Sequence, residues 1–216
     1  MTAGVFETIR VRMGRAPLLE LHAARLEAAC HALDLPVPGR PLADLVSPWL
    51  GPLDVVVRVE VAGPDVGVTS RAVPSAAPLT VILAAVPHAP YPHKATSRAA
   101  FEAAQVEARA AGADDALLLT SHGLVAEGAV WSMFWWEADR VATPSLTLGV
   151  LPGIARARIM TLVPTIERER RPADLAGCSV FAANAVRGII PIRSMDGVLV
   201  PEDPRTTRLA ARFWPR

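Results

Sequence analysis

The sequence predicts an α+β protein of two units, a small N-terminal α/β domain and a larger, mainly antiparallel C-terminal domain. Two observations lead to this prediction. Helical and alternating β-prone segments follow one another in the first part of the chain, whereas strand-like segments dominate after residue 115. Between them, residues 87–92 contain three prolines, which exclude a helix or a central strand. We therefore expect a small domain at 1–86, a Pro-rich linker at 87–93 and the larger domain at 94–216.

The first domain should contain a helix whose apolar side chains share one face. Leu26, Ala29, Cys30 and Leu33 recur at helical spacing, and Pro36 ends the pattern. The expected elements are a strand at 6–11 with a hairpin turn at Gly14 and a return strand at 16–19, a helix at 22–33, a hairpin formed by 55–61 and 66–73, and a further strand at 80–86.

In the second domain a helix precedes most of the strands. Phe101, Ala104, Ala108 and Ala111 lie on one face of this helix, and Gly112 closes it. The expected elements are a helix at 97–111, an antiparallel meander of 116–120, 124–127 and 130–136, a short strand at 140–144, a helix at 155–163, and late strands at 178–182 and 189–192.

The composition argues against several classes of protein. A net charge of +1 and an apolar content of 51% give no electrostatic footprint for nucleic acid or for an acidic membrane surface. There is no apolar run of about 18 residues and no signal-peptide pattern, so we expect a cytoplasmic protein. Cys30 and Cys178 match neither a disulfide framework nor a metal-ligand spacing, and no metal site is expected.

Lys94 is the only lysine in the chain, and arginine supplies every other basic side chain. A chain of this length ordinarily carries on the order of ten lysines. Arginine can replace lysine for solvation, but only lysine provides a primary amine that loses its proton and attacks a carbonyl. Lys94 is therefore a candidate for Schiff-base chemistry; a leftover surface lysine is the alternative.

Three other features fit beside such an amine. Arg25, on the first helix, is a fixed cation suited to a phosphate. Backbone amides of Ile154 and Ala155, at a helix start after Gly153, form a ready anion site. Glu127 lies in an apolar strand, where a carboxylate needs a cation or a donor such as a protonated pyridine nitrogen. A phosphate site, an amine and a pyridinium partner are what pyridoxal phosphate requires. Taken singly, each feature could instead be a surface pair, a strand end or a plain helix start.

The order of these motifs resembles the fold-type IV (class IV) pyridoxal phosphate enzymes, which include branched-chain and D-amino-acid aminotransferases and aminodeoxychorismate lyase. The similar segments run through the chain in family order: 5–11 (Val-Phe-Glu-Thr-Ile-Arg-Val), 22–26 (His-Ala-Ala-Arg-Leu), 93–98 (His-Lys-Ala-Thr-Ser-Arg), 112–119 (Gly-Ala-Asp-Asp-Ala-Leu-Leu-Leu), 123–128 (Gly-Leu-Val-Ala-Glu-Gly), 143–144 (Thr-Pro), 149–154 (Gly-Val-Leu-Pro-Gly-Ile) and 184–192 (Asn-Ala-Val-Arg-Gly-Ile-Ile-Pro-Ile).

The resemblance implies a two-domain fold of the D-amino-acid aminotransferase type, with the site in the interdomain cleft and a homodimer as the assembly. It also implies roles for particular residues. These are Lys94 as the Schiff-base lysine, Glu127 as the partner of the pyridine nitrogen, Arg25 as a phosphate ligand, Ile154 and Ala155 as backbone donors, and Asn184 and Ala185 as the second phosphate-contacting turn.

Within the family, Thr8, the string at 93–98 and the turn at 184–188 are more similar to the lyase branch. The implied function is a lyase of folate biosynthesis that releases pyruvate from 4-amino-4-deoxychorismate and forms 4-aminobenzoate, with Thr8 beside the substrate or the departing group. Transamination of a branched-chain or D-amino acid is the alternative, and a non-catalytic homologue is a third hypothesis.

The chain also departs from the family pattern. It begins almost at the strand of Phe6, without the family's usual first strand. Met133 follows Ser132 where the family commonly has Asn, which puts the hydrogen bonding near Glu127 in question, and Ala155 replaces a frequent threonine. For the substrate carboxylate, Arg10, Arg98 and Arg187 all stay candidates.

Overall fold

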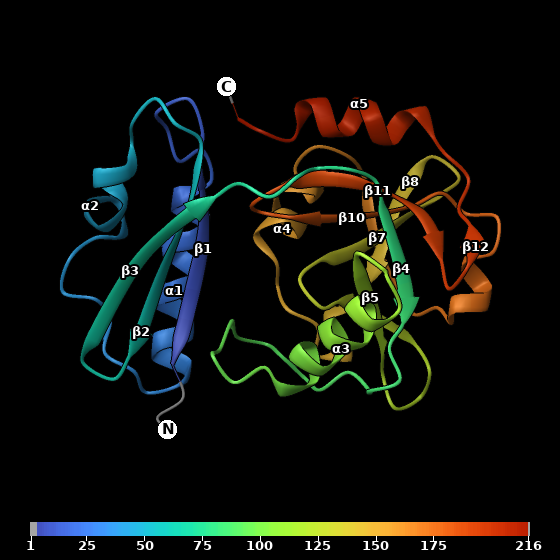
Figure 1. Cartoon of the computed structure of the whole chain (residues 1–216), viewed down its shortest axis with the longest axis horizontal. Helices are drawn as coiled ribbons and strands as arrows, with labels where there is room; N and C mark the ends of the chain where they lie inside the picture. Colours follow the sequence, from blue (N-terminus) through green and yellow to red (C-terminus); the bar gives the residue numbers. More distant parts are fainter. Residues whose placement is uncertain (1–3, 216) are drawn as a thin grey trace.

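The structure, a computed structural model, describes residues 4–215. It consists of a small N-terminal unit and a larger unit that lie side by side (Figure 1). The small unit has a three-stranded antiparallel sheet in the order β1-β2-β3. Its elements are β1 (Val5–Val11), α1 (Leu19–Ala32), α2 (Leu42–Val46), a 3-10 turn η1 (Ser47–Trp49), β2 (Val55–Ala62) and β3 (Asp65–Ala72).

Strand alternation gives this small sheet two different faces. Val5, Ile9, Val57 and Val59 point to one face and form a core with Leu26 and other residues of the helices. The opposite face, which bears Phe6, Thr8 and Arg58, turns toward the larger unit and lines a cavity there. The sheet therefore separates a hydrophobic core from the candidate site.

The hairpin expected at 6–19 does not form. Residues 12–15 make a turn closed by an isolated bridge between Arg12 and Arg15, and α1 begins at Leu19. The partner of β1 is β2, which lies more than 40 residues later in the chain and matches β1 along its whole length. A long valine-rich partner outcompetes the short segment with Pro17.

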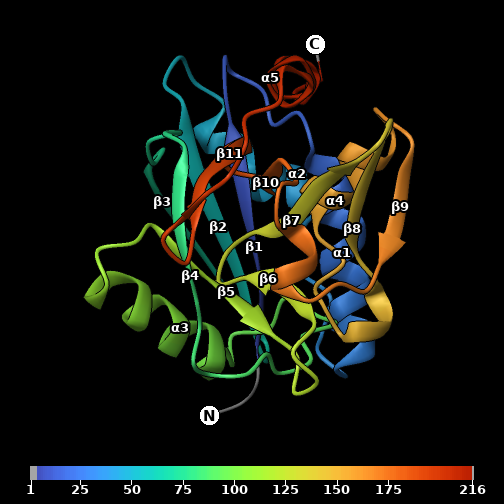
Figure 2. The ribbon, with the colours of Figure 1, turned by 90° about the vertical axis from the view of Figure 1, so that its right-hand side faces the viewer.

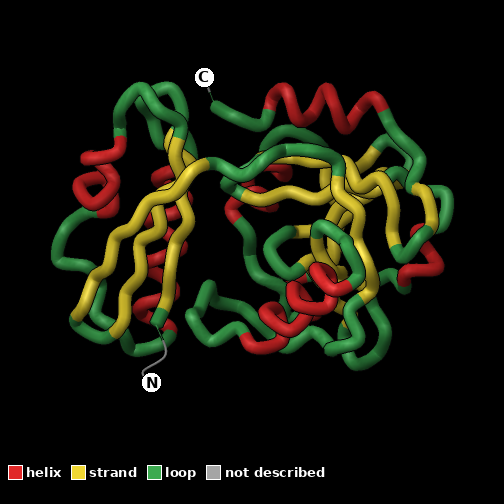
Figure 3. Tube along the Cα trace, in the orientation of Figure 1, coloured by secondary structure: helices red, strands yellow, loops and turns green. Residues whose placement is uncertain are grey.

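The larger unit is built on a nine-stranded mixed sheet in the order β6-β5-β4-β11-β10-β7-β8-β9, with β12 paired to β11. Helices lie around its outside (Figures 2 and 3). Its strands are β4 (Leu79–Leu83), β5 (Asp115–Leu119), β6 (Val125–Gly128), β7 (Ser132–Glu137), β8 (Arg140–Pro144), β9 (Thr165–Arg168), β10 (Val180–Asn184), β11 (Gly188–Met195) and β12 (Val198–Leu199), and its helices are α3 (Ala99–Ala110), α4 (Ile154–Met160) and α5 (Pro204–Arg212), with 3-10 turns η2 (Leu146–Leu148) and η3 (Pro172–Leu175).

Two sequence expectations about strand partners were wrong. The meander expected over 116–136 is incomplete, because β5 pairs with β6 while β7 pairs with β8 and β10. The strand expected at 80–86 in the small domain is β4, which lies in the large sheet between β5 and β11, parallel to both. The chain therefore crosses between the units at 73–78, and the Pro-rich segment 87–93 is a loop of the larger unit.

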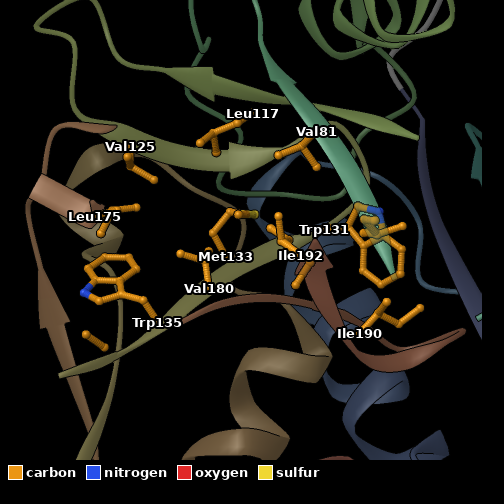
Figure 4. Close-up of a cluster of buried hydrophobic side chains, with 13 residues drawn as sticks. Val81, Leu117, Val125, Trp131, Met133, Trp135, Leu175, Val180, Ile190 and Ile192 are labelled. Atoms are coloured by element: carbon orange, nitrogen blue, oxygen red, sulfur yellow. The ribbon is translucent and has the colours of Figure 1, made fainter. Parts of the chain in front are cut away.

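The core of the larger unit is divided by its sheet. Figure 4 shows one cluster, in which Leu117, Met133 and Trp135 pack with Ile190 and Val180. A second cluster is formed mainly by residues of β7, β10, α4 and α5, and a third lies under α3. These cores fix the positions of the strand ends and helix ends that surround the cavity.

Among residues 4–215, no helix combines the length and apolar character needed to cross a membrane. Within the same range, no group of three or more His, Cys, Asp or Glu side chains is arranged to hold a metal ion.

Candidate active site

A cavity of about 330 Å³ is lined by both units. Its wall from the small unit comes from β1, α1, β2 and β3, and its wall from the larger unit comes from the loop before α3, β6, the start of α4 and the turn after β10. All eight residues that the sequence analysis assigned to a site line this cavity: Thr8, Arg25, Lys94, Glu127, Ile154, Ala155, Asn184 and Ala185.

Lys94 stands at the end of the Pro-rich loop and is tied to β1. The Phe6 amide donates to the Lys94 carbonyl at 2.9 Å, and the Lys94 Nζ lies 4.6 Å from the centre of the Phe6 ring. Burial, followed by the nearby Arg25 cation, lowers the pKa of Lys94 from 10.5 to about 7. A large share of its amine is therefore uncharged near neutral pH, as a nucleophile requires.

The neighbouring residues also close the free edge of β1. Thr96 donates its backbone N–H to the Gly4 carbonyl at 2.8 Å, and an isolated bridge joins Val5 to Ala95. The Tyr91 hydroxyl donates to the Ala95 carbonyl, and burial raises the pKa of Tyr91 to about 12. Tyr91 therefore holds the lysine loop in place and stays protonated.

Arg25 is oriented by a buried carboxylate that the sequence analysis did not identify. Its Nε and one terminal nitrogen donate to the two oxygens of Glu7, each at 2.7 Å, while His22 Nδ1 lies 2.6 Å from Glu7 Oε2. Burial alone would raise the pKa of Glu7, but His22 and Arg25 outweigh it and lower the value to about 2. Burial lowers the pKa of His22, so its neutral ring donates from Nδ1. This bidentate grip leaves the remaining edge of the guanidinium to the cavity.

The start of α4 lies beside Arg25 and forms with it a candidate anion-binding corner. The third guanidinium nitrogen of Arg25 is 3.4 Å from the Pro152 carbonyl, directly before Gly153 and the first helical residues Ile154 and Ala155. The first amides of a helix have no acceptor within it and carry the positive end of its dipole. Gly153 has no free space for a side chain, because a Cβ there would lie 2.6 Å from the Ser132 Oγ. Backbone and guanidinium donors thus converge as a phosphate would require.

Glu127 presents one carboxylate oxygen to two donors. Its Oε1 lies 2.9 Å from His88 Nε2 and accepts the Leu151 amide at 3.0 Å. Glu127 is 5% exposed, and it is the one carboxylate among the described residues that line the cavity. The question raised by Met133 is therefore answered elsewhere: Met133 points into the core, and His88 and Leu151 supply the hydrogen bonds.

The turn after β10 is held by Asn184. Its Oδ1 accepts the amides of Val186 and Arg187 at 3.0 and 2.8 Å, and its Nδ2 donates to the Val130 carbonyl at 3.3 Å. The Asn184 side chain is thus engaged in shaping the turn, while Ala185 lines the cavity.

The structure separates the three arginines that were candidates for a substrate carboxylate. Arg10 lies outside the cavity lining and binds Asp54 at 2.5 Å, so it is not a candidate. Arg98 and Arg187 do line the cavity; Arg98 donates to the Ala129 carbonyl at 2.7 Å, and Arg187 stacks over Trp131 with its Cζ 4.3 Å from the ring centre.

Two further arginines of the small sheet join the cavity wall, and the sequence analysis missed both. Arg58 stacks 3.6 Å above the Phe6 ring and pairs with Glu60, and the exposed Arg71 follows on the same face. Their position follows from strand register, since Thr8 and Arg58 are directly paired.

Signals for the missed residues differed in strength. Glu7 interrupts the apolar alternation of Val5, Ile9 and Val11, and a carboxylate on a buried face calls for a cation. His22 and Arg25 stand three residues apart on one helix, which brings them to the same face. His88 had no such signal, because nothing in a Pro-rich loop predicts which strand it will contact.

The sequence is also similar to those of known proteins. A family model described as amino-transferase class IV matches residues 4–195. The branched-chain-amino-acid aminotransferase of Escherichia coli K12 is 32% identical over 117 residues, which are 50% of this chain and 38% of that protein. The aminodeoxychorismate lyase of Bacillus subtilis is 31% identical over 90 residues, 39% of this chain and 31% of that protein. These matches span well under two thirds of the relatives' length.

Among solved structures, a hypothetical aminotransferase from Mycobacterium tuberculosis in its PLP-bound form superposes with a TM-score of 0.86 and 22% identity, over 96% of this chain and 86% of that one. The two chains therefore share one fold.

Proposed function

The chain belongs to the class IV aminotransferase family, and on this basis we propose that it is a pyridoxal phosphate-dependent 4-amino-4-deoxychorismate lyase, which releases pyruvate and forms 4-aminobenzoate. The family and the PLP-bound neighbour support the cofactor. The charge of the cavity wall supports the choice of substrate.

The residues present fit this cofactor. Arg25 and the amides of Ile154 and Ala155 form a corner suited to the phosphate, with the turn at Ala185 as a second contact. Lys94 would hold the aldehyde carbon, and Glu127 would face the pyridine nitrogen. When bound, the cofactor supplies an electron sink for the carbon next to the substrate nitrogen.

The observation that carries the substrate assignment is the charge of the cavity wall. Beyond Arg25 and Lys94, the described lining residues include Arg58, Arg71, Arg98 and Arg187, against one carboxylate, Glu127. 4-Amino-4-deoxychorismate carries two carboxylates, which such a wall can bind. A branched-chain amino acid needs an apolar pocket for its side chain. Arg58 has Glu60 as a partner, but a side chain buried beside Arg71, Arg98 and Arg187 would desolvate these cations without compensation.

In this proposal each protein group has a defined task. Lys94, a large share of which is uncharged near neutral pH, would hold the cofactor and, once free, would take up and return protons. Thr8, on the cavity face of β1, donates a hydrogen bond to the substrate or to the departing pyruvate unit. Glu127 would accept a hydrogen bond from the ring nitrogen and favour its protonated form.

Transamination is the second candidate, supported by the similarity to the Escherichia coli aminotransferase over half of this chain. It would use the same lysine and carboxylate, with the amino group of an amino acid passing in the end to an oxo acid. A non-catalytic homologue would have no chemical need for a lysine at position 94, yet Lys94 is the one lysine in the chain.

A product assay tests the proposal. The purified protein, loaded with pyridoxal phosphate, is incubated with 4-amino-4-deoxychorismate and, separately, with a panel of branched-chain and D-amino acids plus 2-oxoglutarate. We expect stoichiometric pyruvate and 4-aminobenzoate from the first reaction and slow or no glutamate formation in the second. Rapid glutamate formation without pyruvate release would replace the lyase by the transaminase.

A further inference from the structure

We propose that His88 is a positioning residue for Glu127: it fixes one oxygen of the carboxylate and so turns the second oxygen toward the cofactor ring. The inference rests on the part of the proposed function that places the pyridine nitrogen opposite Glu127. It holds for a lyase and for a transaminase alike, because both need a protonated ring nitrogen.

The contact is short and enclosed. The Nε2–Oε1 distance is 2.9 Å, and the exposed fractions of the two side chains are 1% for His88 and 7% for Glu127. For buried groups a hydrogen bond to a charge is stronger than at the surface, and an unpaired carboxylate is costly. The pair therefore contributes more than a surface contact would.

The position of His88 is fixed independently of Glu127. Its backbone amide donates to the Leu119 carbonyl at 2.7 Å, and its ring meets the edge of Phe101 at 5.7 Å between centroids, with an interplanar angle of 86°. Phe101 in turn contacts the Tyr91 ring at 4.8 Å. The imidazole is thus held by the loop and by α3, so it can orient its partner instead of following it.

The two oxygens of Glu127 differ in their hydrogen-bond partners. His88 and the Leu151 amide both donate to Oε1, whereas no described residue donates to Oε2. An oxygen with two donors is satisfied, and the other oxygen remains available to a new donor from the cavity, such as a pyridinium N–H. The hydrogen bonds to Oε1 thus fix the carboxylate so that Oε2 is the oxygen a protonated ring nitrogen would meet.

Three substitutions separate donation from packing. His88→Leu fills space without a donor. His88→Gln places an amide nitrogen near the position of Nε2, and His88→Asn has the same chemistry on a shorter side chain that does not reach Glu127. Thermal unfolding monitored by circular dichroism establishes that each variant is folded before it is loaded with cofactor.

The decisive readout is nitrogen-15 NMR of the holoenzyme reconstituted with cofactor labelled at the ring nitrogen. We expect the protonated resonance in the wild type and in His88→Gln, and a shift toward the unprotonated position in His88→Leu and His88→Asn. The kcat of those two variants should fall about 10- to 100-fold with KM changed less than about threefold, the range of one lost hydrogen bond to a charged group. A ring nitrogen that stays fully protonated in both variants would overturn the inference, as would equal loss in His88→Gln.

The proposed function and the role of His88 can fail separately. If borohydride reduction and peptide mapping find no pyridoxyl group on Lys94 of the wild type, the proposed function fails before His88 is tested. If the cofactor is on Lys94 in every variant and the resonance does not move, only the role of His88 is wrong. Should His88→Leu not fold, the comparison of Gln with Asn decides.

Discussion

At the scale of single residues, the site is defined by charged groups whose neighbours change their behaviour. Lys94 is buried near Arg25, which in turn is gripped by Glu7. The pKa values of Lys94 and Glu7 are both lowered, with opposite consequences for charge. The amine of Lys94 loses its proton near neutral pH, whereas the Glu7 carboxyl keeps its charge down to strongly acidic pH. Both can be measured.

The reactivity of Lys94 toward pyridoxal phosphate should depend on pH in a narrow window. An amine attacks only when uncharged, so the rate of cofactor attachment should rise with pH and level off above about 7, the lowered pKa of Lys94. Stopped-flow absorbance with the cofactor-free protein measures this rate, and Lys94→Arg should show no attachment. A rate that keeps rising to pH 10 would mean that the lysine is solvated.

Glu7→Gln should destabilise the protein and weaken its phosphate corner. The substitution leaves Arg25 without its carboxylate, which we expect to cost about 3 kcal/mol of unfolding free energy and to weaken cofactor binding roughly 10-fold. Urea unfolding and cofactor titration measure the two effects. Glu20→Gln, on the exposed side of α1, should change stability by less than about 0.5 kcal/mol.

The stability difference between wild type and Glu7→Gln should depend on acid in one direction. Because folding lowers the pKa of Glu7 from 4.5 to about 2, its stabilisation is complete above about pH 4.5 and is lost as the pH falls toward 2. A difference that is constant from pH 7 to pH 2 would contradict the ion pair.

Thr8→Val distinguishes the two candidate reactions. It removes a hydroxyl at nearly constant volume, and we expect pyruvate release to fall about 10- to 1000-fold, the effect of one lost transition-state hydrogen bond or proton-transfer group. Cofactor content should be unchanged. If the wild type converts its cofactor to the amine form with an amino acid, and Thr8→Val does so equally fast, the lyase assignment is wrong.

At the scale of elements, the candidate anion-binding corner of Arg25, Ile154 and Ala155 depends on how closely β7 approaches the start of α4. Gly153 has an extended backbone with φ of −67°, which any residue can adopt, so its need for glycine comes from space alone. Ser132 Oγ lies 2.6 Å from the position that a Cβ at residue 153 would take, which is too close for both atoms to stay in place. The first turn of α4 and the wall of the cavity are thus coupled through one hydroxyl.

Gly153→Ala should therefore weaken cofactor binding about fivefold, because Ser132 must leave its rotamer or α4 must shift, at about 1 kcal/mol. Combining it with Ser132→Ala removes the hydroxyl and should restore most of the affinity, a coupling that a double-mutant cycle measures by cofactor titration. Equal losses in the single and double variants would show that the contact is not the cause.

At the scale of the whole molecule, the two units create one cationic cavity between separate cores. Arg58 and Arg71 come from the small sheet, Arg98 and Arg187 from the larger unit, and their side chains line the same space. Each unit thus contributes two of these four arginines. We therefore expect the placement of the two units to affect the binding of an anionic substrate.

Arg71→Ala should raise the KM for 4-amino-4-deoxychorismate about 10- to 100-fold through loss of a charge-assisted hydrogen bond, with cofactor affinity unchanged. Arg10→Ala is the matched control: Arg10 stands on the same face of the same sheet but pairs with Asp54 outside the cavity lining. Steady-state kinetics should show little change for Arg10→Ala. Equal KM for both variants would remove Arg71 from the substrate site.

The sequence by itself determined the local elements and much of the chemistry. Alternation at 55–61 and 66–73 predicted a hairpin, which forms as β2 and β3, because the strand period is a property of the backbone. The uniqueness of Lys94, and the cost of burying Glu127 without a partner, pointed to groups that the structure brings to one cavity. The order of motifs predicted the family, which the family match confirms.

Tertiary structure alone decided which distant segments meet. β4 joined the large sheet, and β1 paired with β2 instead of 16–19, because strand pairing depends on competition between distant partners. Arg10 and Arg71 lie on the same face of one sheet, yet Asp54 holds Arg10 away from the cavity. His88 reaches Glu127, 39 residues later, only because its loop bonds to β5. Such contacts follow from the packing of the whole chain, and no local pattern encodes them.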